Sequence, residues 1–401
     1  MLSVLGQILL YVVPGLLVLT FIVTVHELGH FLVARAFKVK IERFAIGFGR
    51  ALLSRTDRNG TEWRVGWLPL GGYVKFAGDL DSSSVPDEAG LAELRSRIIA
   101  EHGPGAERDY FYFKPIWQRA LVTVAGPVAN FILSITLLSL FFVAYGESVQ
   151  PVRVGEVTAG SPAAAAGLRV GDTIMRVNGR VVRSGDDVTR VVQLSSDTPV
   201  AFVVDRAGSE LTVSATPERS TTTDPLGGRI TVGRVGIGLV STRAETRIIR
   251  YNPIESVGAG FRQTFEILDD TLTYVGRIFT GRENGDQLSG PIGIAKASGA
   301  LTEAAVKANP DPGAMFGNVA RTLFFLAAIL SIGIGFLNLL PIPILDGGHL
   351  VFYAYEAVAR RPVAAKVQEA SYRVGLALLA GLMLFATWND VQKYFLGGLA
   401  S

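Results

Sequence analysis

Residues 25–30 read VHELGH, and they close a stretch in which the first 25 residues carry no charged side chain. An apolar helix of about 20 residues spans the hydrocarbon core of a bilayer. His26, Glu27 and His30 therefore lie at the end of a candidate transmembrane helix, where ionisable side chains are costly to bury. Such residues at membrane depth usually have a function, so this stretch is the first candidate for a functional site.

Four apolar runs predict a membrane protein with four transmembrane helices. The runs are Ile8–Val25, Leu121–Tyr145, Thr322–Leu345 and the shorter Val374–Trp388. The chain is 49% hydrophobic and only 18% charged, and its mean hydropathy is +0.36. The first run has no basic segment before it and no cleavage site of small residues, so we interpret it as a retained helix. The predicted helical regions are residues 1–37, 119–146, 318–346 and 372–396.

Composition excludes several classes of function. The chain has no cysteine, which rules out thiol catalysis, disulfides and thiolate metal sites. The formal net charge of +3 gives no indication of nucleic-acid binding. The partner that composition predicts is the lipid bilayer.

Basic residues predict the orientation of the helices. They gather after the first run and between the third and fourth, which places both loops in the cytoplasm by the positive-inside rule. The residues are Arg35, Lys38, Lys40, Arg43, Arg50, Arg55 and Arg58 in the first loop, and Arg360, Arg361, Lys366 and Arg373 in the second. Four crossings then leave both termini outside, and the HELGH motif lies toward the cytoplasmic side.

The segments between the helices differ in character. Residues 38–78 predict a membrane-associated β-hairpin, because Asn59-Gly60 is a strong turn signal between strand-like arms that are too apolar for an ordinary loop. We interpret residues 79–118 as a cytoplasmic connector between the hairpin and the second helix. After the second helix, alternating runs such as VAFVVDRAGSELTVSA predict a water-soluble, β-rich domain on the outer face.

The spacing of the two histidines predicts a zinc site. On a helix, His26 and His30 lie one turn apart on the same face, so both imidazoles can reach one metal ion. Glu27 is offset by about 100° and can act as general base toward water. The alternative is a polar helix end at the bilayer surface.

A catalytic zinc usually takes three protein ligands. The remaining candidates are His102, His349 or a carboxylate. Asp346, in the stretch NLLPIPILDGGH, is the acid associated with the late part of a predicted span. The first and third helices both run inward, so Asp346 reaches the same depth as His26, which favours Asp346 as the third ligand.

The motifs together resemble those of the bacterial site-2 proteases, in particular the RseP-type membrane zinc metalloproteases. The resemblance rests on HELGH, on GPVANF at residues 126–131 and on NLLPIPILDGG, which occur in the family's order. It implies that His26, His30 and Asp346 bind one zinc ion per chain and that Glu27 is the catalytic base. It also implies substrate-binding roles for Asn338 and Asn130. The alternative for the small residues of GPVANF is close helix packing.

A second resemblance lies in the outer segment. Residues 154–182, VGEVTAGSPAAAAGLRVGDTIMRVNGRVV, are similar to a bacterial PDZ module, which we place at residues 150–217. PDZ grooves bind extended peptides by strand addition, so the expected partner is a peptide or the outer domain of a substrate. One clear copy is visible where the RseP-type proteins carry two. Residues 218–317 predict a β segment and an amphipathic helical region.

The predicted fold class is a polytopic α-helical membrane protein with four transmembrane helices, a membrane-associated β-hairpin and an extracytoplasmic, β-rich PDZ domain. The resemblance implies a multi-pass protease of the bacterial inner membrane. It would cut transmembrane segments of single-span membrane proteins, such as anti-sigma factors or remnant signal peptides, as the second step of regulated intramembrane proteolysis. The alternatives are a catalytically silent PDZ-bearing scaffold or a transporter, although a transporter normally has more spans and internal repeats.

Overall fold

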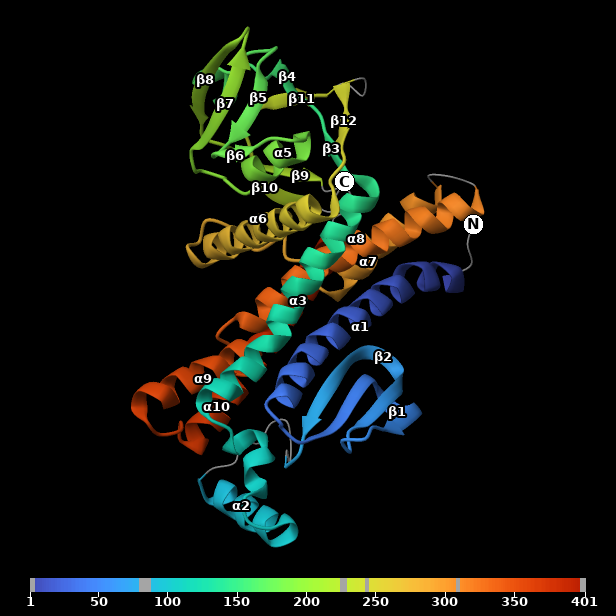
Figure 1. Ribbon diagram of the computed structural model, residues 1–401. Helices are drawn as coiled ribbons and strands as arrows, with labels where there is room; N and C mark the ends of the chain where they lie inside the picture. Colours follow the sequence, from blue (N-terminus) through green and yellow to red (C-terminus); the bar gives the residue numbers. More distant parts are fainter. Residues whose placement is uncertain (1–3, 79–87, 224–228, 242–244, 308–310, 397–401) are drawn as a thin grey trace. The chain divides into compact units, whose positions relative to one another are not determined.

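The computed structural model describes residues 4–78, 88–223, 229–241, 245–307 and 311–396. The chain divides into two compact units (Figure 1), the first formed by Met1–Leu137 and Ile294–Phe385 and the second by Leu138–Gly293 and Ala386–Ser401. Three predicted segments lie partly outside the described residues: residues 1–3 of the first helix, 79–87 of the connector, and 224–228, 242–244 and 308–310 of the outer region. The last residues, 397–401, also lie outside them.

Within the described residues, four helices are long and apolar enough to cross a membrane, which confirms the predicted number. They are α1 (Val4–Ala36), α3 (Ile116–Tyr145), α8 (Pro312–Leu339) and α10 (Ala365–Val391). A short π-helical turn, Gln392–Leu396, extends α10. The chain is therefore a membrane protein by the length and composition of its helices.

Several helix boundaries differ from those predicted, and α8 begins at Pro312 rather than near residue 318. Helix α8 ends at Leu339 rather than near residue 346, because Pro341 and Pro343 cannot continue it. Helix α9 (Asp346–Ala359) then begins at the aspartate. Helix α10 begins at Ala365, seven residues before the predicted start at 372. Its first turns carry charged residues that form a helix readily, so a hydropathy pattern does not detect them.

Small residues let the first-unit helices approach closely. A Cβ atom at Gly29 of α1 would lie 2.4 Å from the carbonyl oxygen of Ala125 in α3. The hydroxyl of Ser331 in α8 donates a hydrogen bond to the backbone oxygen of Asn130 in α3, at 2.8 Å. Interfaces of this kind hold membrane helices together where lipid removes the hydrophobic driving force.

Strands β1 (Ile41–Thr56) and β2 (Glu62–Phe76) form an antiparallel sheet beside α1 (Figure 1). Both strands bend, so the first part of β1 pairs on both sides: Phe44 is opposite Trp63 and also opposite Val74. The segment 72–76 therefore forms one edge of this sheet. Phe31 of α1 packs against Phe44 and Trp63 with ring centroids 5.3 and 5.0 Å apart, which fixes the sheet on the helix.

The region after β2 contains helix α2 (Glu88–His102) and the short 3-10 turns Ala106–Asp109 and Phe111–Phe113. Leu94, Ile98 and Tyr110 are buried together with Ala77. The described part of the predicted connector thus has a small core of its own.

In the second unit, six strands form one sheet with the order β11-β4-β5-β7-β8, and β6 pairs with β5. The strands are β4 (Val152–Val157), β5 (Thr173–Val177), β6 (Arg180–Val181), β7 (Val200–Arg206), β8 (Ser209–Ala215) and β11 (Ile237–Val240). Helices α4 (Pro162–Ala166) and α5 (Gly185–Gln193) complete it, and both contribute buried residues to its core.

Strand β11 lies beyond the predicted end of the outer module at residue 217. It pairs with β4, and Val235 just before it is buried in the core of the sheet. The compact module therefore extends at least to Val240. The sequence signal was weak because β11 is joined to the rest of the sheet by a long return connection.

Two smaller ladders and a long helix complete this unit. Strand β3 (Glu147–Val149) pairs with β12 (Arg247–Ile249), and β9 (Glu218–Thr223) pairs with β10 (Arg229–Arg234). Helix α6 (Pro253–Phe279) is joined to the sheet by ion pairs, including Arg180 to Asp270 at 2.5 Å and Arg183 to Glu266 at 3.7 Å. Helix α7 (Pro291–Lys307) follows α6 and belongs to the first unit from Ile294 onward.

Candidate metal centre

Helix α1 places the two motif histidines on one face, one turn apart. His26 is 6% exposed, and the Nε2 atoms of His26 and His30 are 3.2 Å apart. Both rings therefore point their Nε2 atoms at one position.

The break between α8 and α9 brings Asp346 to the same position. A Cβ atom at Gly347 would lie 2.3 Å from the carbonyl oxygens of Leu339 and Leu340, and one at Gly348 would lie 2.3 Å from that of Ile342. Only glycine permits this tight return of the backbone. The two glycines after Asp346 thus allow the carboxylate to sit at the start of α9, facing α1.

The three side chains form a set of donors that fits zinc. The Oδ2 atom of Asp346 lies 3.1 Å from Nε2 of His26 and 3.5 Å from Nε2 of His30. Ligands about 2.0–2.1 Å from a tetrahedral ion are separated by about 3.3 Å. The three observed separations bracket this value, and two imidazoles with one carboxylate are a ligand set that catalytic zinc uses.

Contacts behind the ligands fix their orientation. The Nδ1 atom of His30 lies 2.8 Å from the carbonyl oxygen of Val122 in α3, so Nδ1–H donates and Nε2 keeps its lone pair. A Cβ atom at Gly126 of α3 would lie 2.3 Å from Nε2 of His30 and 2.8 Å from Cε1 of His26. The glycine of the GPVANF motif is therefore needed for α3 to pass beside the histidines.

Glu27 is positioned by the hairpin. Its Oε2 atom accepts a hydrogen bond from the backbone N–H of Val74 at 3.1 Å. Val74 lies in the edge segment of β2, and its N–H points away from β1. The carboxylate is thus held between α1 and the edge segment 72–76 of the sheet.

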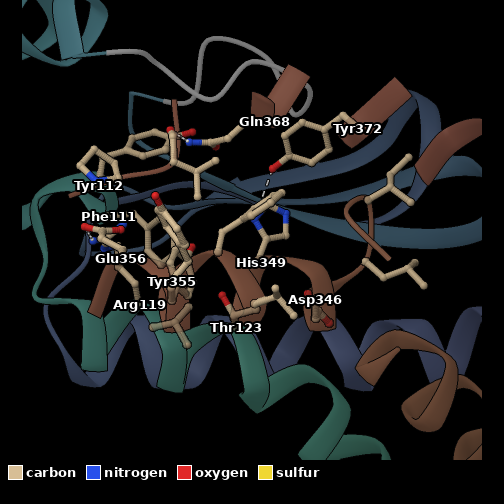
Figure 2. Close-up of a pocket in the computed structure, with 18 of the residues that line it drawn as sticks. Phe111, Tyr112, Arg119, Thr123, Asp346, His349, Tyr355, Glu356, Gln368 and Tyr372 are labelled. Carbon is tan, nitrogen blue, oxygen red and sulfur yellow. Dashed lines mark hydrogen bonds and ion pairs between the residues drawn. The ribbon is translucent and has the colours of Figure 1, made fainter. Parts of the chain in front are cut away.

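The motif residues His26, Glu27 and His30, together with Asp346, line a cavity of about 1430 Å³ in the first unit. Figure 2 shows part of its wall, with Asp346 and His349 on one side and the pair Arg119–Glu356 on the other. The Arg119 guanidinium donates to Glu356 at 2.6 Å and covers the ring of Tyr353 at 5.0 Å. The cavity is therefore partly apolar, partly charged, and large enough for several residues of an extended peptide.

The other candidate ligands lie elsewhere or have other partners. His102 ends α2, is exposed, and lies 3.0 Å from Nζ of Lys40. His349 lines the cavity, but its Nδ1 atom faces the hydroxyl of Tyr372 at 3.4 Å. Burial lowers the pKa of the His349 imidazole. The geometry favours Asp346 among the alternatives that the sequence left open.

The two asparagines with predicted substrate-binding roles occupy different environments. Asn338 lines the cavity, and its Nδ2 atom donates to the carbonyl oxygen of Ile334 in its own helix. Asn130 is completely buried, and its Nδ2 atom lies 3.2 Å from Nδ1 of His26. Direct contact between Asn130 and a substrate would require this side chain to be uncovered first.

Two contributors to the site were not predicted from the sequence. Both are backbone groups, the N–H of Val74 and the carbonyl of Val122. Any residue other than proline at these positions would supply the same backbone group, so the amino-acid type gives no sequence signal for either contact. The signal nearest to Val122 is the small-residue motif that begins at Gly126, which predicts close approach of α3 to a partner.

A membrane protein with an HExxH helix and a third, acidic ligand candidate in one cavity has the arrangement of a membrane-bound metalloprotease. Comparison with known proteins supports this class. The model of peptidase family M50 matches residues 14–382. The chain is 45% identical to metalloprotease MmpA of Caulobacter vibrioides, over 98% of each chain. It is 42% identical to a protein of Agrobacterium fabrum, over 96% of each chain, and 38% identical to one of Rhizobium meliloti, over 96% and 97%; both carry names of zinc metalloproteases.

The chain belongs to peptidase family M50, the site-2 proteases. It is a zinc metalloendopeptidase. Its family confirms the resemblance drawn from the motifs and favours an enzyme over the scaffold and transporter alternatives.

Proposed function

We propose that the protein is an intramembrane endopeptidase that cleaves transmembrane segments of single-span membrane proteins, as the second cut in regulated intramembrane proteolysis. One observation carries the proposal: His26, His30 and Asp346 converge at the end of an apolar helix, with Glu27 beside them. This arrangement puts hydrolytic chemistry at membrane depth, where only a membrane-embedded substrate reaches it.

In this proposal His26, His30 and Asp346 hold one zinc ion per chain and Glu27 is the general base. When bound, zinc polarises the scissile carbonyl and lowers the pKa of the attacking water toward neutrality. Glu27 takes the proton from that water and passes it to the leaving amine nitrogen. The bond from Val74 holds the carboxylate in place for this transfer.

Substrate binding is assigned to the edge of the hairpin. An intact helix has every amide bonded internally, so a transmembrane segment must unwind before its peptide bond can react. The edge segment 72–76 pairs with β1 on one side only among the described residues. Alternate residues of an edge strand turn their N–H and C=O groups outward, so Gly72 shares the outward direction of Val74. An unwound substrate that adds as a strand here would lie beside Glu27.

The cavity would accommodate the residues around the scissile bond. Asn338 lines it on the α8 side, and we assign to it the contact with substrate that the family resemblance implied. Strand addition selects substrates that can extend their backbone and whose side chains fit the site, rather than substrates of one exact sequence.

The six-stranded sheet of the second unit is proposed to be a PDZ domain that controls access of substrates. Strand β11 ends the sheet on one side, and α5 lies close to it: a Cβ atom at Gly185 would be 3.8 Å from Cδ1 of Leu239. An open strand edge beside a helix suits capture of an extended peptide. Its expected partner is a peptide or the outer domain of a substrate.

The proposed location is the bacterial inner membrane, with both termini extracytoplasmic and the active site toward the cytoplasm. Support comes from the basic loops that follow α1 and α9. Reporters fused after Arg58 and Arg361 should read as cytoplasmic and one fused near Asp205 as extracytoplasmic. The opposite readings would overturn this orientation.

The substrates can be identified by comparing membrane proteomes. Cells that produce the active protein are compared with cells that produce the Glu27→Gln variant. Single-span proteins, such as anti-sigma factors already trimmed outside or remnant signal peptides, should accumulate as membrane-length fragments only in the variant. Identical fragment patterns would contradict intramembrane cleavage.

A further inference from the structure

The two motif histidines are held from behind by different groups. For His30 the partner of Nδ1 is a backbone carbonyl, which can only accept a hydrogen bond. For His26 the partner is the side-chain amide of Asn130, which can either donate or accept. The tautomer of His26, that is, which of its ring nitrogens carries the proton, therefore depends on which way this amide faces.

In the structure the Nδ2 atom of Asn130 lies 3.2 Å from Nδ1 of His26, and the Oδ1 atom is buried with no hydrogen-bond partner among the described residues. With Nδ2 donating, Nδ1 of a neutral His26 must be the acceptor, and the proton must sit on Nε2. That tautomer blocks the nitrogen that faces Asp346 and His30.

A half-turn of the amide exchanges its oxygen and nitrogen without changing its shape. The oxygen then accepts from Nδ1–H of His26, and Nε2 presents its lone pair to the metal. We propose that Asn130 is a positioning residue for zinc: its side-chain oxygen accepts the Nδ1–H of His26 and thereby selects the tautomer that binds the ion. This inference rests on the proposed ligand role of His26.

The surroundings of Asn130 suit such a role. The side chain is completely buried, so no water competes for His26. Its backbone oxygen accepts from the hydroxyl of Ser331 at 2.8 Å, which ties this turn of α3 to α8. The backbone of Asn130 is thus held in place, and a half-turn of its amide changes only which atom faces His26.

The test measures zinc affinity of the full-length protein by competition with a chelator, together with thermal unfolding of the zinc-free protein. Asn130→Leu keeps a similar volume but removes the acceptor, and Asn130→Asp keeps acceptor oxygens but has no N–H. Ser331→Ala is the matched control, because it weakens the same α3–α8 contact without touching His26. If Asn130→Leu does not fold, Asn130→Ala replaces it, since alanine introduces no clash and favours the helix.

We expect Asn130→Leu or Asn130→Ala to lower zinc affinity by about 10–100-fold, the usual effect of losing a partner behind a ligand. Asn130→Asp and Ser331→Ala should keep affinity within about threefold of the original protein. Equal loss in Asn130→Asp and Asn130→Leu would overturn the proposal, because the amide N–H or the packing would then be what matters. Unchanged affinity in Asn130→Leu, or equal loss in Ser331→Ala, would overturn it as well. If the original protein binds zinc but cleaves no membrane-embedded substrate, the proposed function fails, whereas the zinc affinities of the Asn130 variants test only the positioning role.

Discussion

The Oε2 atom of Glu27 accepts a hydrogen bond from the N–H of Val74 at 3.1 Å, which links the zinc-motif helix to the edge of the β-hairpin. A substrate strand that pairs with this edge would therefore bring its backbone directly to the proposed base. The N–H of Val74 would thus connect substrate binding at the sheet edge with proton transfer by Glu27.

Removing that group should impair cleavage without removing zinc. Val74→Pro deletes the N–H, and because this N–H does not belong to the ladder with β1, no strand hydrogen bond is lost. We expect cleavage to fall by at least about tenfold, as for other losses of a group that positions a base. Val74→Ala, which keeps the N–H, is the control and should retain most activity. Similar losses in both variants would show that the side chain, and not the N–H, is required.

Gly126 should be intolerant of even one methyl group. Gly126→Ala would place a Cβ atom 2.3 Å from Nε2 of His30, so α3 must move away and disturb the ligands. We predict at least about tenfold weaker zinc binding, measured by chelator competition. Gly333→Ala in α8 is the matched control, because nothing lies within 4 Å of its added Cβ atom. Normal zinc affinity in Gly126→Ala would disprove the close approach.

The sheet of the second unit should lose stability in acid through Asp172. This carboxylate is 1% exposed and accepts from Nε of Arg206 at 2.7 Å, and the pairing lowers its pKa. A carboxyl group whose folded pKa lies below its unfolded value of about 3.9 stabilises the fold above that pH. The stability is lost as pH falls further, through the folded pKa.

Asp172→Asn should therefore cost about 1–3 kcal/mol near pH 7, because Arg206 loses its charged partner. The difference from the original protein should shrink as the pH falls below about 4. This stability difference is measured by thermal unfolding of the full chain, in which proteolytic cleavage within the sheet reports the unfolding. Glu210→Gln removes an exposed pair with Arg176 and should have little effect. A constant difference at every pH would contradict the role of this ionisation.

Deleting the proposed PDZ domain should relax substrate choice and leave catalysis intact. Deleting residues 152–240 removes the whole six-stranded sheet but keeps the ladder of β3 with β12 on either side of the deletion, in which Val149 is opposite Arg247. A cut at the predicted boundary of 217 would leave β11 without its partner β4.

No proposed zinc ligand leaves with the deletion. If the domain excludes bulky outer domains, the deletion variant should cut untrimmed substrates as well as trimmed ones. If it captures trimmed ends instead, cleavage of the normal substrate should slow. We favour exclusion. A folded, zinc-loaded variant that cuts neither substrate would show that the domain belongs to the catalytic assembly.

The sequence was most informative where a physical constraint acts locally. Apolar length predicted the four helices, and the spacing of His26 and His30 predicted that both face one point. The two prolines before Asp346 predicted a break but not its consequence, that the aspartate would begin a new helix. The end of the sheet at β11 was missed because strand pairing between distant segments leaves little local pattern.

The contacts behind the site were least predictable. Val74 and Val122 act through backbone groups, which any residue would supply. Asn130 was predicted to bind substrate, a prediction that nothing yet tests, and the structure shows its amide against His26. Its position depends on how closely α1 and α3 approach, which follows from Gly29 and Gly126 only once the partner is known.

The most direct test of the central claim compares zinc content and cleavage in three purified proteins: the original, Glu27→Gln, and the double variant His26→Ala with His30→Ala. A glutamine at position 27 can still accept the Val74 N–H, so the fold and metal should persist while proton transfer is lost. The account predicts about one zinc per chain and cleavage in the original, about one zinc without cleavage in Glu27→Gln, and neither in the double variant. Full zinc in the double variant, or zinc loss in Glu27→Gln equal to that in the double variant, would contradict it.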